Sequence, residues 1–404
     1  MAGLLFIVVA GLAHARDLTL SQAEELVARN NRELLASRRA LESAQAQTEI
    51  AGARPNATFS VNSTSIASGV QGADTVFRID QPFERGDKRT LRLDAASGLE
   101  RAAQRDTQDV LRQQLAAARG AYFDLKQAEE RARVLDETAE LFGGTLAAAQ
   151  TRLKAGDLAA ADVAKVEVDH GRAQNDARAA RADLARAQLA LAYLIGEEAA
   201  AAELHASDPW PVTQRADMSA IGEAVEARPD VLAAKARLEA AERLRDLARA
   251  QRTRDVTLGA QYEHFPGTTP ANSVGFGISV PLFTGYNFSG DIRKAEVDRY
   301  AALDQLERVR AVATGELRRA ASDLDSAADR LERFDASLLA AASRSTEAVE
   351  FAFRRGASSV LEVLDARRTL RAVRLEALAA RTDHAKAYAA WRAAQTTAEM
   401  LETK

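Results

Sequence analysis

Two long stretches without proline constrain this chain more than any other feature of its sequence. All eight prolines lie outside residues 83–208 and 282–404. A proline inside a helix costs about 3 kcal/mol, so its absence permits very long helices. Within both stretches, apolar residues recur at spacings of three and four, which is the pattern of a helix with one apolar face. One such run is Leu111, Leu115, Ala118 and Tyr122. Each stretch is therefore predicted to be almost wholly helical.

Glycines divide each stretch near its middle. Gly143-Gly144 and Gly156 interrupt the first stretch, and Gly356 interrupts the second. Glycine lets a chain reverse direction because it adopts positive φ at little cost. Each stretch is therefore predicted to be a long helical hairpin, over about 88–196 and about 290–400, with breaks at these glycines.

The composition favours packed helices and excludes several classes of protein. The 404 residues are 47% hydrophobic but only 5% aromatic. Much of the apolar fraction is alanine, which is the best helix former but buries little area. The absence of cysteine excludes disulfides, thiolate metal sites and cysteine nucleophiles. The net charge of −4, with acidic and basic residues well mixed, gives no indication of nucleic acid binding.

The N-terminus has the features of an export signal. Residues 4–13 form an apolar run, and Ala13-His14-Ala15 fits the small-x-small cleavage pattern. This run is too short to cross a bilayer as a helix, and no apolar run of about 18 residues follows it. No lysine or arginine precedes the run, so the alternative is a plain apolar N-terminus. We expect residues 1–15 to be a signal peptide and the protein to be exported.

The chain is predicted to contain two copies of one unit. Pro82-Phe83 with Gly86 is matched by Pro281-Leu282 with Gly285, and the segment around Gly156 is matched by the segment around Gly356. Landmarks that recur in the same order at a nearly constant offset indicate an internal repeat. The predicted domains are a first repeat over 16–196, a linker over 197–216 and a second repeat over 217–404.

Each repeat is also predicted to contain two short strands. In the second repeat they cover about 255–263 and about 272–282, and in the first about 56–65 and about 74–83. Apolar and small or polar residues alternate along them, as in Val274-Gly275-Phe276-Gly277-Ile278. Turn-rich loops separate the strands, at Ser68–Gly72 in the first repeat and His264–Pro270 in the second.

The alternation along these strands favours a membrane β-barrel. Strands of about ten residues with one apolar face are its typical signature. The alternative is a solvent-exposed hairpin packed on helices. Four strands cannot close a membrane barrel, and an open strand edge in lipid is strongly unfavourable. The barrel interpretation therefore requires several copies of the chain, and three copies give a wider pore than two.

This order of elements resembles the TolC-like outer membrane factor family, the exit ducts of tripartite efflux pumps and type I secretion systems. The resemblance covers nearly the whole chain after residue 15 and rests on duplicated markers in a fixed order. Its markers are Leu20–Leu41, Gln81-Pro82-Phe83, Val280-Pro281-Leu282-Phe283 and the two segments at Gly156 and Gly356.

The resemblance implies a mainly α fold with a small β part. It further implies a homotrimer with a twelve-stranded outer-membrane β-barrel and a periplasmic α-helical barrel. The implied partners are a periplasmic adaptor protein, an inner-membrane pump of the RND type and outer membrane lipid. No cofactor and no nucleic acid is implied. The implied location is the outer membrane, with an extension into the periplasm.

One stretch resembles the cobalt–zinc–cadmium branch of this family. Gln81–Arg89 is similar to that branch's "QP-x-E-x-GGKR" pattern, with Asp87 in place of its second glycine, and Asn287–Ile292 is similar to "N-x-x-G-x-I". This favours efflux of heavy-metal cations. The segment Val280–Gly285 also suits drug-efflux or secretion branches, which remain the alternative.

The hairpin tips are the candidate site of partner binding. By resemblance, Gly156, Leu158, Gly356 and Val360 are candidates for contact with the adaptor. In the family the tips form the periplasmic mouth. One well-studied member has an arginine two residues after the second glycine that helps to lock this mouth; here that position is Ser358.

Acidic residues follow both tip glycines. Asp162, Glu362 and Asp365 occupy positions that line an anionic aperture in the family. Rings of carboxylates favour cations. The alternative is that these acids only complement the dipoles of the helices they begin, each worth about 0.3–1 kcal/mol.

No catalytic or metal-binding motif is present in the sequence. The five histidines are scattered, and H-E-x-x-H, P-loop and G-x-S-x-G patterns are absent. The chain is therefore predicted not to be an enzyme. A structural or adaptor protein of the envelope, built on coiled-coil hairpins, is the alternative of another class. The twofold repeat with paired strands favours the duct.

Overall fold

The computed structural model describes residues 16–64, 73–266 and 271–402. The predicted signal peptide and most of the two loops between the strands lie outside these residues. The described chain forms two compact units. The first comprises the described residues of Met1–Ala36, Asp109–Val225 and Ala313–Lys404, and the second those of Ser37–Gln108 and Glu226–Val312. Both predicted repeats contribute to both units, so the division into repeats remains a prediction from the sequence.

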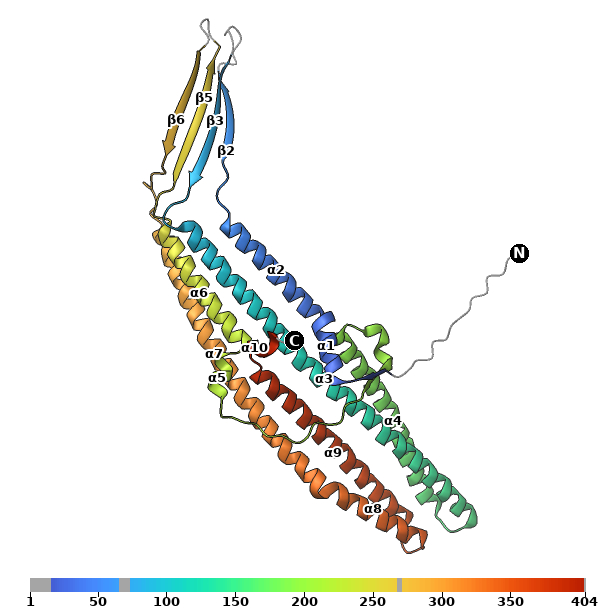
Figure 1. Ribbon diagram of the computed structural model, residues 1–404. Coiled ribbons are helices and arrows are strands. Elements are labelled where there is room, and N and C mark those ends of the chain that lie inside the picture. The colour runs from blue at the N-terminus through green and yellow to red at the C-terminus, as the bar shows by residue number, and fades with distance from the viewer. Residues whose placement is uncertain (1–15, 65–72, 267–270, 403–404) are drawn as a thin grey trace, which may run out of the picture. The chain divides into compact units, whose positions relative to one another are not determined.

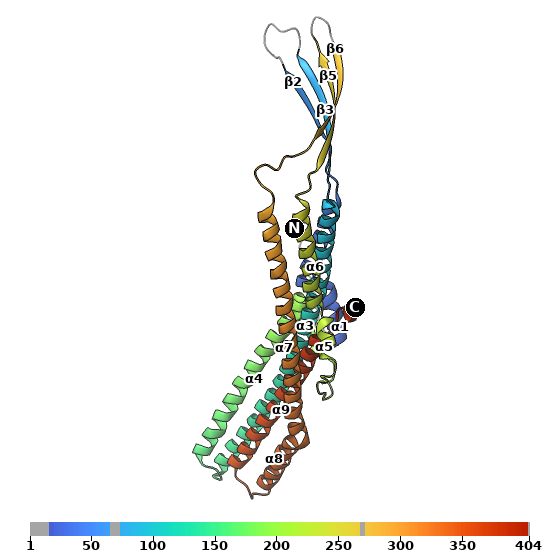
Figure 2. The same ribbon diagram turned by 90° about the vertical axis from the view of Figure 1, so that its left-hand side faces the viewer.

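Long helices dominate the fold, as the proline-free stretches predict. The helix α3 (Lys88–Ala155) has 68 residues, or about 100 Å at 1.5 Å per residue. It is followed by α4 (Ala160–Ile195), while α7 (Ser289–Arg333), α8 (Leu339–Arg354) and α9 (Val360–Gln395) make up the second hairpin. In Figures 1 and 2, α8 and α9 lie side by side. The prediction of a mainly α fold with a small β part is confirmed.

Two local predictions about the helices were wrong or incomplete. The helix α3 passes through Gly143-Gly144 without a break. A glycine in a helix costs only about 1 kcal/mol, and here the missing side chain leaves room for His170, whose Cε1 would lie 3.1 Å from a Cβ at Gly143. In the second hairpin, a π-helical turn, Phe334–Leu338, separates α7 from α8. This turn contains neither proline nor glycine, so no pattern in the sequence predicts it.

The first unit also contains several short elements. They are β1 (Arg16–Leu18), α1 (Leu20–Asn30), a 3-10 helix (Glu198–Glu203), β4 (Leu204–Ala206), α5 (Ile221–Glu226) and α10 (Ala398–Glu402). The strands β1 and β4 pair in parallel, and the sequence analysis missed them because three residues show no periodicity. Tyr122 is buried beside them, donates to the Leu18 carbonyl at 3.0 Å and accepts from the Asp208 N–H at 2.9 Å.

The second unit contains the sheet. Its strands are β2 (Thr58–Thr64), β3 (Asp74–Phe83), β5 (Val256–Phe265) and β6 (Ala271–Ser279), in the order β2-β3-β5-β6 with every pair antiparallel. Both views in Figures 1 and 2 show the four strands side by side. The unit also holds α2 (Arg32–Gly52) from Ser37 onward, α6 (Pro229–Ala250) and the first parts of α3 and α7.

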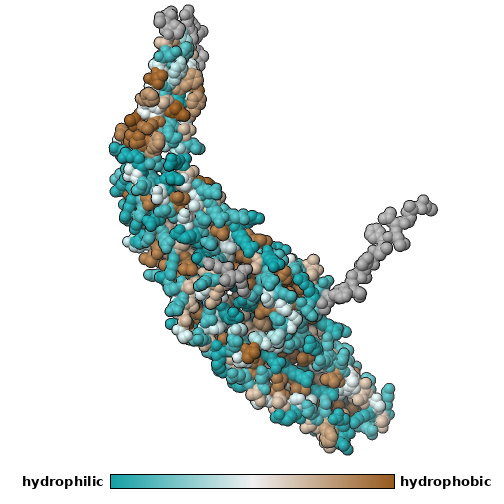
Figure 3. All heavy atoms as spheres, viewed as in Figure 1, coloured by the Kyte–Doolittle hydropathy of each residue, from teal (hydrophilic) through white to brown (hydrophobic). Residues whose placement is uncertain are grey.

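The two faces of the sheet differ in polarity. Residues that pair directly across strands lie on the same face, so the register assigns each residue to one face. One face carries large apolar side chains, and the space-filling view shows apolar residues gathered over the strands (Figure 3). Phe276, Ile278 and Val274 are 86%, 74% and 69% exposed. The opposite face carries small and polar residues. These include Ser60, Arg78, Gln261 and Gly275, which pair in register across the four strands.

Candidate functional site

The two hairpin tips lie in the first unit and have the same backbone geometry. Gly156 directly follows α3 and has a φ of 81°. Gly356 lies two residues after the end of α8 and has a φ of 74°. At each tip the glycine N–H donates to a carbonyl three residues back at 3.0 Å. The next N–H donates to a carbonyl five residues back at 2.9 Å. This is the pattern of a Schellman-type helix end, which needs a residue with positive φ. The turn itself therefore favours glycine at both tips.

The tips differ in how the next helix begins. Ser359 is the N-cap of α9, and its hydroxyl accepts from the Glu362 N–H at 3.3 Å. Ala159 is the N-cap of α4 and has no side chain that can accept a hydrogen bond. The start of α9 is therefore stabilised by a cap of a kind typically worth about 1 kcal/mol, and the start of α4 is not.

The structure brings the apolar adaptor-contact candidates together. Val360 is only 6% exposed and packs in one cluster with Val166 and Leu364, and half-buried Leu158 packs against it. Gly156 and Gly356 are exposed. In a single chain the two tips thus pack against each other through Leu158 and Val360, while the glycines face solvent.

A groove that no sequence pattern predicts lies beside this cluster. Its volume is about 360 Å³, and its lining is mostly apolar. The lining residues come from α3, α8 and α9 together with Leu158, and include Leu141, Ala148, Phe353, Val360 and Val363. The Arg152 guanidinium also lies over the Phe353 ring, 4.5 Å from its centroid, in a cation–π contact. No sequence pattern marks the groove, because residues from three helices form it.

The three aperture candidates lie near the tips in different surroundings. Asp162 is half-buried and pairs with Lys165, with Oδ1 3.1 Å from Nζ. Glu362 accepts a hydrogen bond from the Ser358 hydroxyl, which holds the pKa of this carboxyl below its ordinary value. Asp365 is exposed on the second turn of α9. Ser358 thus acts on a carboxylate of its own chain.

Arginines of α9 join this helix to three others. Arg367 pairs with Glu350 of α8 at 2.8 Å and donates to the Thr145 hydroxyl of α3 at 2.7 Å. Arg368 pairs with Asp169 of α4, whose side chain is only 6% exposed. Arg371 pairs with Asp176 of α4 at 3.1 Å. No sequence pattern predicts this network, because charged residues are frequent along the whole chain.

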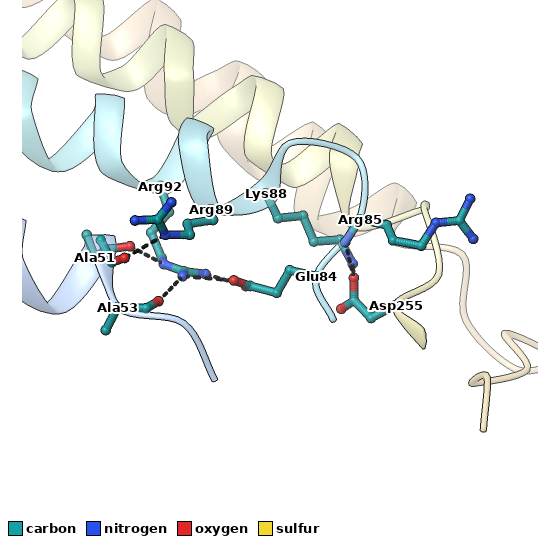
Figure 4. Close-up of polar contacts among 9 residues, drawn as sticks. Ala51, Ala53, Glu84, Arg85, Lys88, Arg89, Arg92 and Asp255 are labelled. Carbon is teal, nitrogen blue, oxygen red and sulfur yellow. Dashed lines mark hydrogen bonds and ion pairs between the residues drawn. The ribbon is translucent and has the colours of Figure 1, made fainter. Parts of the chain in front are cut away.

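In the second unit, the stretch Gln81–Arg89, which resembles the cobalt–zinc–cadmium branch, connects β3 to α3 and forms a joint with α2 and β5 (Figure 4). Arg92 pairs with both carboxylate oxygens of Glu84, at 2.6 and 3.1 Å, and donates to the carbonyls of Ala51 and Ala53. Arg89 donates to the Gly52 carbonyl at 2.6 Å. These arginines satisfy carbonyls at the end of α2, which no helical N–H can reach.

The other half of this joint fixes the start of β5. Asp255 accepts from buried Lys88 at 2.8 Å and from the Arg85 N–H at 2.9 Å. Gly86 has φ +70°, and a Cβ there would lie 2.8 Å from Thr253 Cβ. Asp87 has φ 57°, which aspartate tolerates better than most residues. The motif thus has a structural role in holding β3, α2 and β5 around one turn.

Neither a metal centre nor a membrane-spanning helix is found in the described parts of the chain. Within residues 16–64, 73–266 and 271–402, no three His, Asp or Glu side chains gather in a way that could hold a metal ion. Among the same residues, no helix combines the length and apolar character needed to cross a membrane.

The comparisons with known proteins agree with this architecture. Residues 220–397 match the family described as outer membrane efflux protein. The cobalt-zinc-cadmium resistance protein CzcC of Cupriavidus metallidurans is 26% identical over 372 residues, which cover 90% of this chain and 86% of CzcC. Among solved structures, the outer-membrane channel OprN gives a TM-score of 0.78 at 22% identity, over 93% of this chain and 89% of OprN. CusC gives 0.79 at 18% identity, over 97% of this chain and 95% of CusC.

Long hairpins joined to a four-stranded sheet, together with these matches, define an outer membrane efflux channel with a periplasmic extension. Channels of this class are components of tripartite efflux systems and are not enzymes. The chain is thus similar to the TolC-like outer membrane efflux protein family: residues 220–397 match the family, and the fold is that of OprN and CusC.

Proposed function

We propose that three copies of this chain form one duct. Three sheets would close a twelve-stranded barrel in the outer membrane, and the long helices would form a hollow shaft in the periplasm. The observation that carries this proposal is a sheet with one highly exposed apolar face, whose outer strands β2 and β6 each pair with only one strand among the described residues. Unpaired backbone groups in lipid cost several kcal/mol each, so such a sheet needs further copies at its edges.

The oligomeric state tests this proposal directly. Purified in detergent, the full chain should sediment as a trimer and should aggregate when detergent is removed. A monomer that stays in solution without detergent would contradict the duct and would favour the envelope adaptor protein as the alternative.

We propose the hairpin tips as the docking surface for a periplasmic adaptor that links the duct to an inner-membrane pump of the RND type. Gly156 and Gly356 are exposed there, and Leu158 and Val360 line the mostly apolar groove beside them. A partner helix could place small apolar side chains in a groove of this kind. Gly156 and Gly356 would allow its close approach.

We propose Asp162, Glu362 and Asp365 as the lining of the periplasmic aperture. Three copies of each would give rings of carboxylates, which favour cations and repel one another. The Ser358 hydroxyl donates to Glu362 and lowers the pKa of this carboxyl, which favours its ionised form. The alternative, that these acids only complement helix dipoles, predicts no change in ion preference when they are neutralised.

We propose heavy-metal cations such as cobalt, zinc and cadmium as the cargo. Two observations support this: the similarity to CzcC over 90% of the chain, and the Gln81–Arg89 stretch. Deletion of the gene should lower tolerance to these metals, and the intact gene should restore it. Unchanged metal tolerance together with increased sensitivity to drugs would favour the drug-efflux alternative.

A further inference from the structure

Charged and polar side chains on the polar face of the sheet form one hydrogen-bonded network across three strands. Arg78 of β3 donates from Nε and Nη2 to the two carboxylate oxygens of Asp80, at 2.7 and 2.8 Å. Its Nη1 donates to Gln261 Oε1 of β5 at 3.0 Å. Gln261 in turn donates to Glu263 at 2.7 Å, and Ser273 of β6 donates to the other oxygen of Glu263 at 3.1 Å.

Two glycines lie beneath this hydrogen-bonded network, and their lack of side chains leaves room for it. A Cβ at Gly259 would lie 2.4 Å from Asp80 Oδ1 and 2.7 Å from Arg78 Nη2. A Cβ at Gly277 would lie 3.7 Å from the same Nη2. The guanidinium therefore lies flat over glycine backbone instead of standing out from the sheet. The side chains of Arg78 and Asp80 are only 33% and 27% exposed as a result.

We propose that Asp80 and Gln261 position Arg78 flat against the wall of the exit passage, and that Arg78, Asp80 and Glu263 set the charge preference of that passage. This inference rests on the proposed function, because the polar face lines water only if the sheets close into a barrel. One guanidinium then stands against two carboxylates in every chain. The wall therefore carries a net negative charge at this level, which favours cations over anions.

Pairing with Asp80 matters for shape as well as for charge. An arginine fork binds a carboxylate through two parallel hydrogen bonds, which fixes the plane of the guanidinium. Asp80 is two residues from Arg78 on the same strand, so the pair lies along the wall. Without Asp80, the long side chain of Arg78 is free to extend into the passage and to place an unbalanced positive charge there.

The absence of cysteine from the sequence makes a direct test possible. Ser60 pairs in register with Arg78 across β2 and β3, so Ser60→Cys places one thiol on the polar face beside the guanidinium. Val61→Cys places one on the apolar face as the matched control. Trimers in phospholipid vesicles are treated with a cationic or an anionic methanethiosulfonate reagent, and the ratio of the two reaction rates reports the local charge.

In the Ser60→Cys background, Arg78→Gln should raise the cationic-to-anionic rate ratio, and Asp80→Asn should lower it. Each change should be about threefold, as expected for one unit charge within about 7 Å in screened water. The double variant should return the ratio to that of the parent. Arg78→Lys keeps the charge but cannot form the planar fork. It should lower the ratio, because its ammonium is no longer held against the wall.

The outcomes separate this inference from the proposed function. If the Ser60→Cys thiol is inert in vesicles while the Val61→Cys thiol reacts, the barrel itself is wrong. If the Ser60→Cys thiol reacts and the ratio is the same in Arg78→Gln and Asp80→Asn, the charge preference is set elsewhere and the inference is overturned. A parental ratio in Arg78→Lys would overturn the positioning role of Asp80. Retention of the trimer in each variant excludes misfolding as the cause of a change.

Discussion

Replacing Gly86 with alanine should destabilise the protein more than the same replacement at Gly356. Both glycines have positive φ, 70° and 74°, and this backbone conformation costs an L-residue about 1–2 kcal/mol. At Gly356 nothing lies within 4 Å of the added Cβ, so this strain is the whole effect. At Gly86 the Cβ would lie 2.8 Å from both Cβ and Oγ1 of Thr253. Overpacking of this kind adds about 1–3 kcal/mol, which gives a total of about 2–5 kcal/mol.

Chemical unfolding of the trimer in detergent, followed by circular dichroism, measures both changes in the free energy of unfolding. A Thr253→Gly substitution removes all three atoms nearest to the new Cβ. In the Gly86→Ala background it should therefore recover the overpacking part and leave only the backbone strain. Equal costs at Gly86 and Gly356, or no recovery with Thr253→Gly, would refute the reasoning that close approach to Thr253 requires a glycine at position 86.

Three further predictions concern the first unit. Arg368→Gln should lower the free energy of unfolding by about 1–2 kcal/mol, measured by chemical denaturation, because it leaves the carboxylate of Asp169 buried without its charged partner. Burial raises the pKa of Tyr122 to about 12, so stability should be lost as the pH rises from about 10, the pKa of unfolded tyrosine, to about 12; a Tyr122→Phe variant should lack this loss. Ser358→Ala should raise the pKa of Glu362 in a carbon-13 NMR titration, because the Ser358 hydroxyl is the main cause of its lowered pKa.

The controls follow from the same contacts. Arg344→Gln, another arginine of the second hairpin but one that is exposed on α8, should change the stability little. For Glu362, a lowered pKa contributes stability above the pKa of the unfolded carboxyl, and this contribution is lost as the pH falls through the folded value. The Ser358→Ala variant should therefore lack this contribution, and its stability should depend less on pH in this range. A pKa for Glu362 unaltered by Ser358→Ala would contradict the assigned hydrogen bond.

The long helices could be predicted because their signal is an absence spread over many residues. The two proline-free stretches together cover more than half of the sequence, so the signal does not depend on any one residue. The tip glycines have positive φ, a backbone conformation that is strained in a residue with a side chain. The prediction at Gly143-Gly144 failed for the opposite reason. The cost of a glycine inside a helix is small, and packing of the long α3, with His170 beside Gly143, outweighs it.

The position of the candidate site along the chain could be predicted from the sequence, but the contacts within the site could not. The tips are local in the chain, so Gly156 and Gly356 mark them. The burial of Val360 depends on α3 and α4, which approach it from distant parts of the sequence. The groove and the ion pairs of Arg367 and Arg368 likewise join helices far apart in the chain. A single sequence does not reveal such pairs.

The unequal capping of α4 and α9 has a consequence for the way the tips respond to a partner. A helix end without a cap unwinds locally at low free energy, while a capped end holds its first turn. Ala159 leaves the start of α4 easy to unwind, and Ser359 holds the start of α9. The two tips therefore have the same turn, but the helix that follows the turn unwinds more easily at the first tip than at the second. A partner that docks on both meets one end that can adapt its shape and one end that serves as a fixed template.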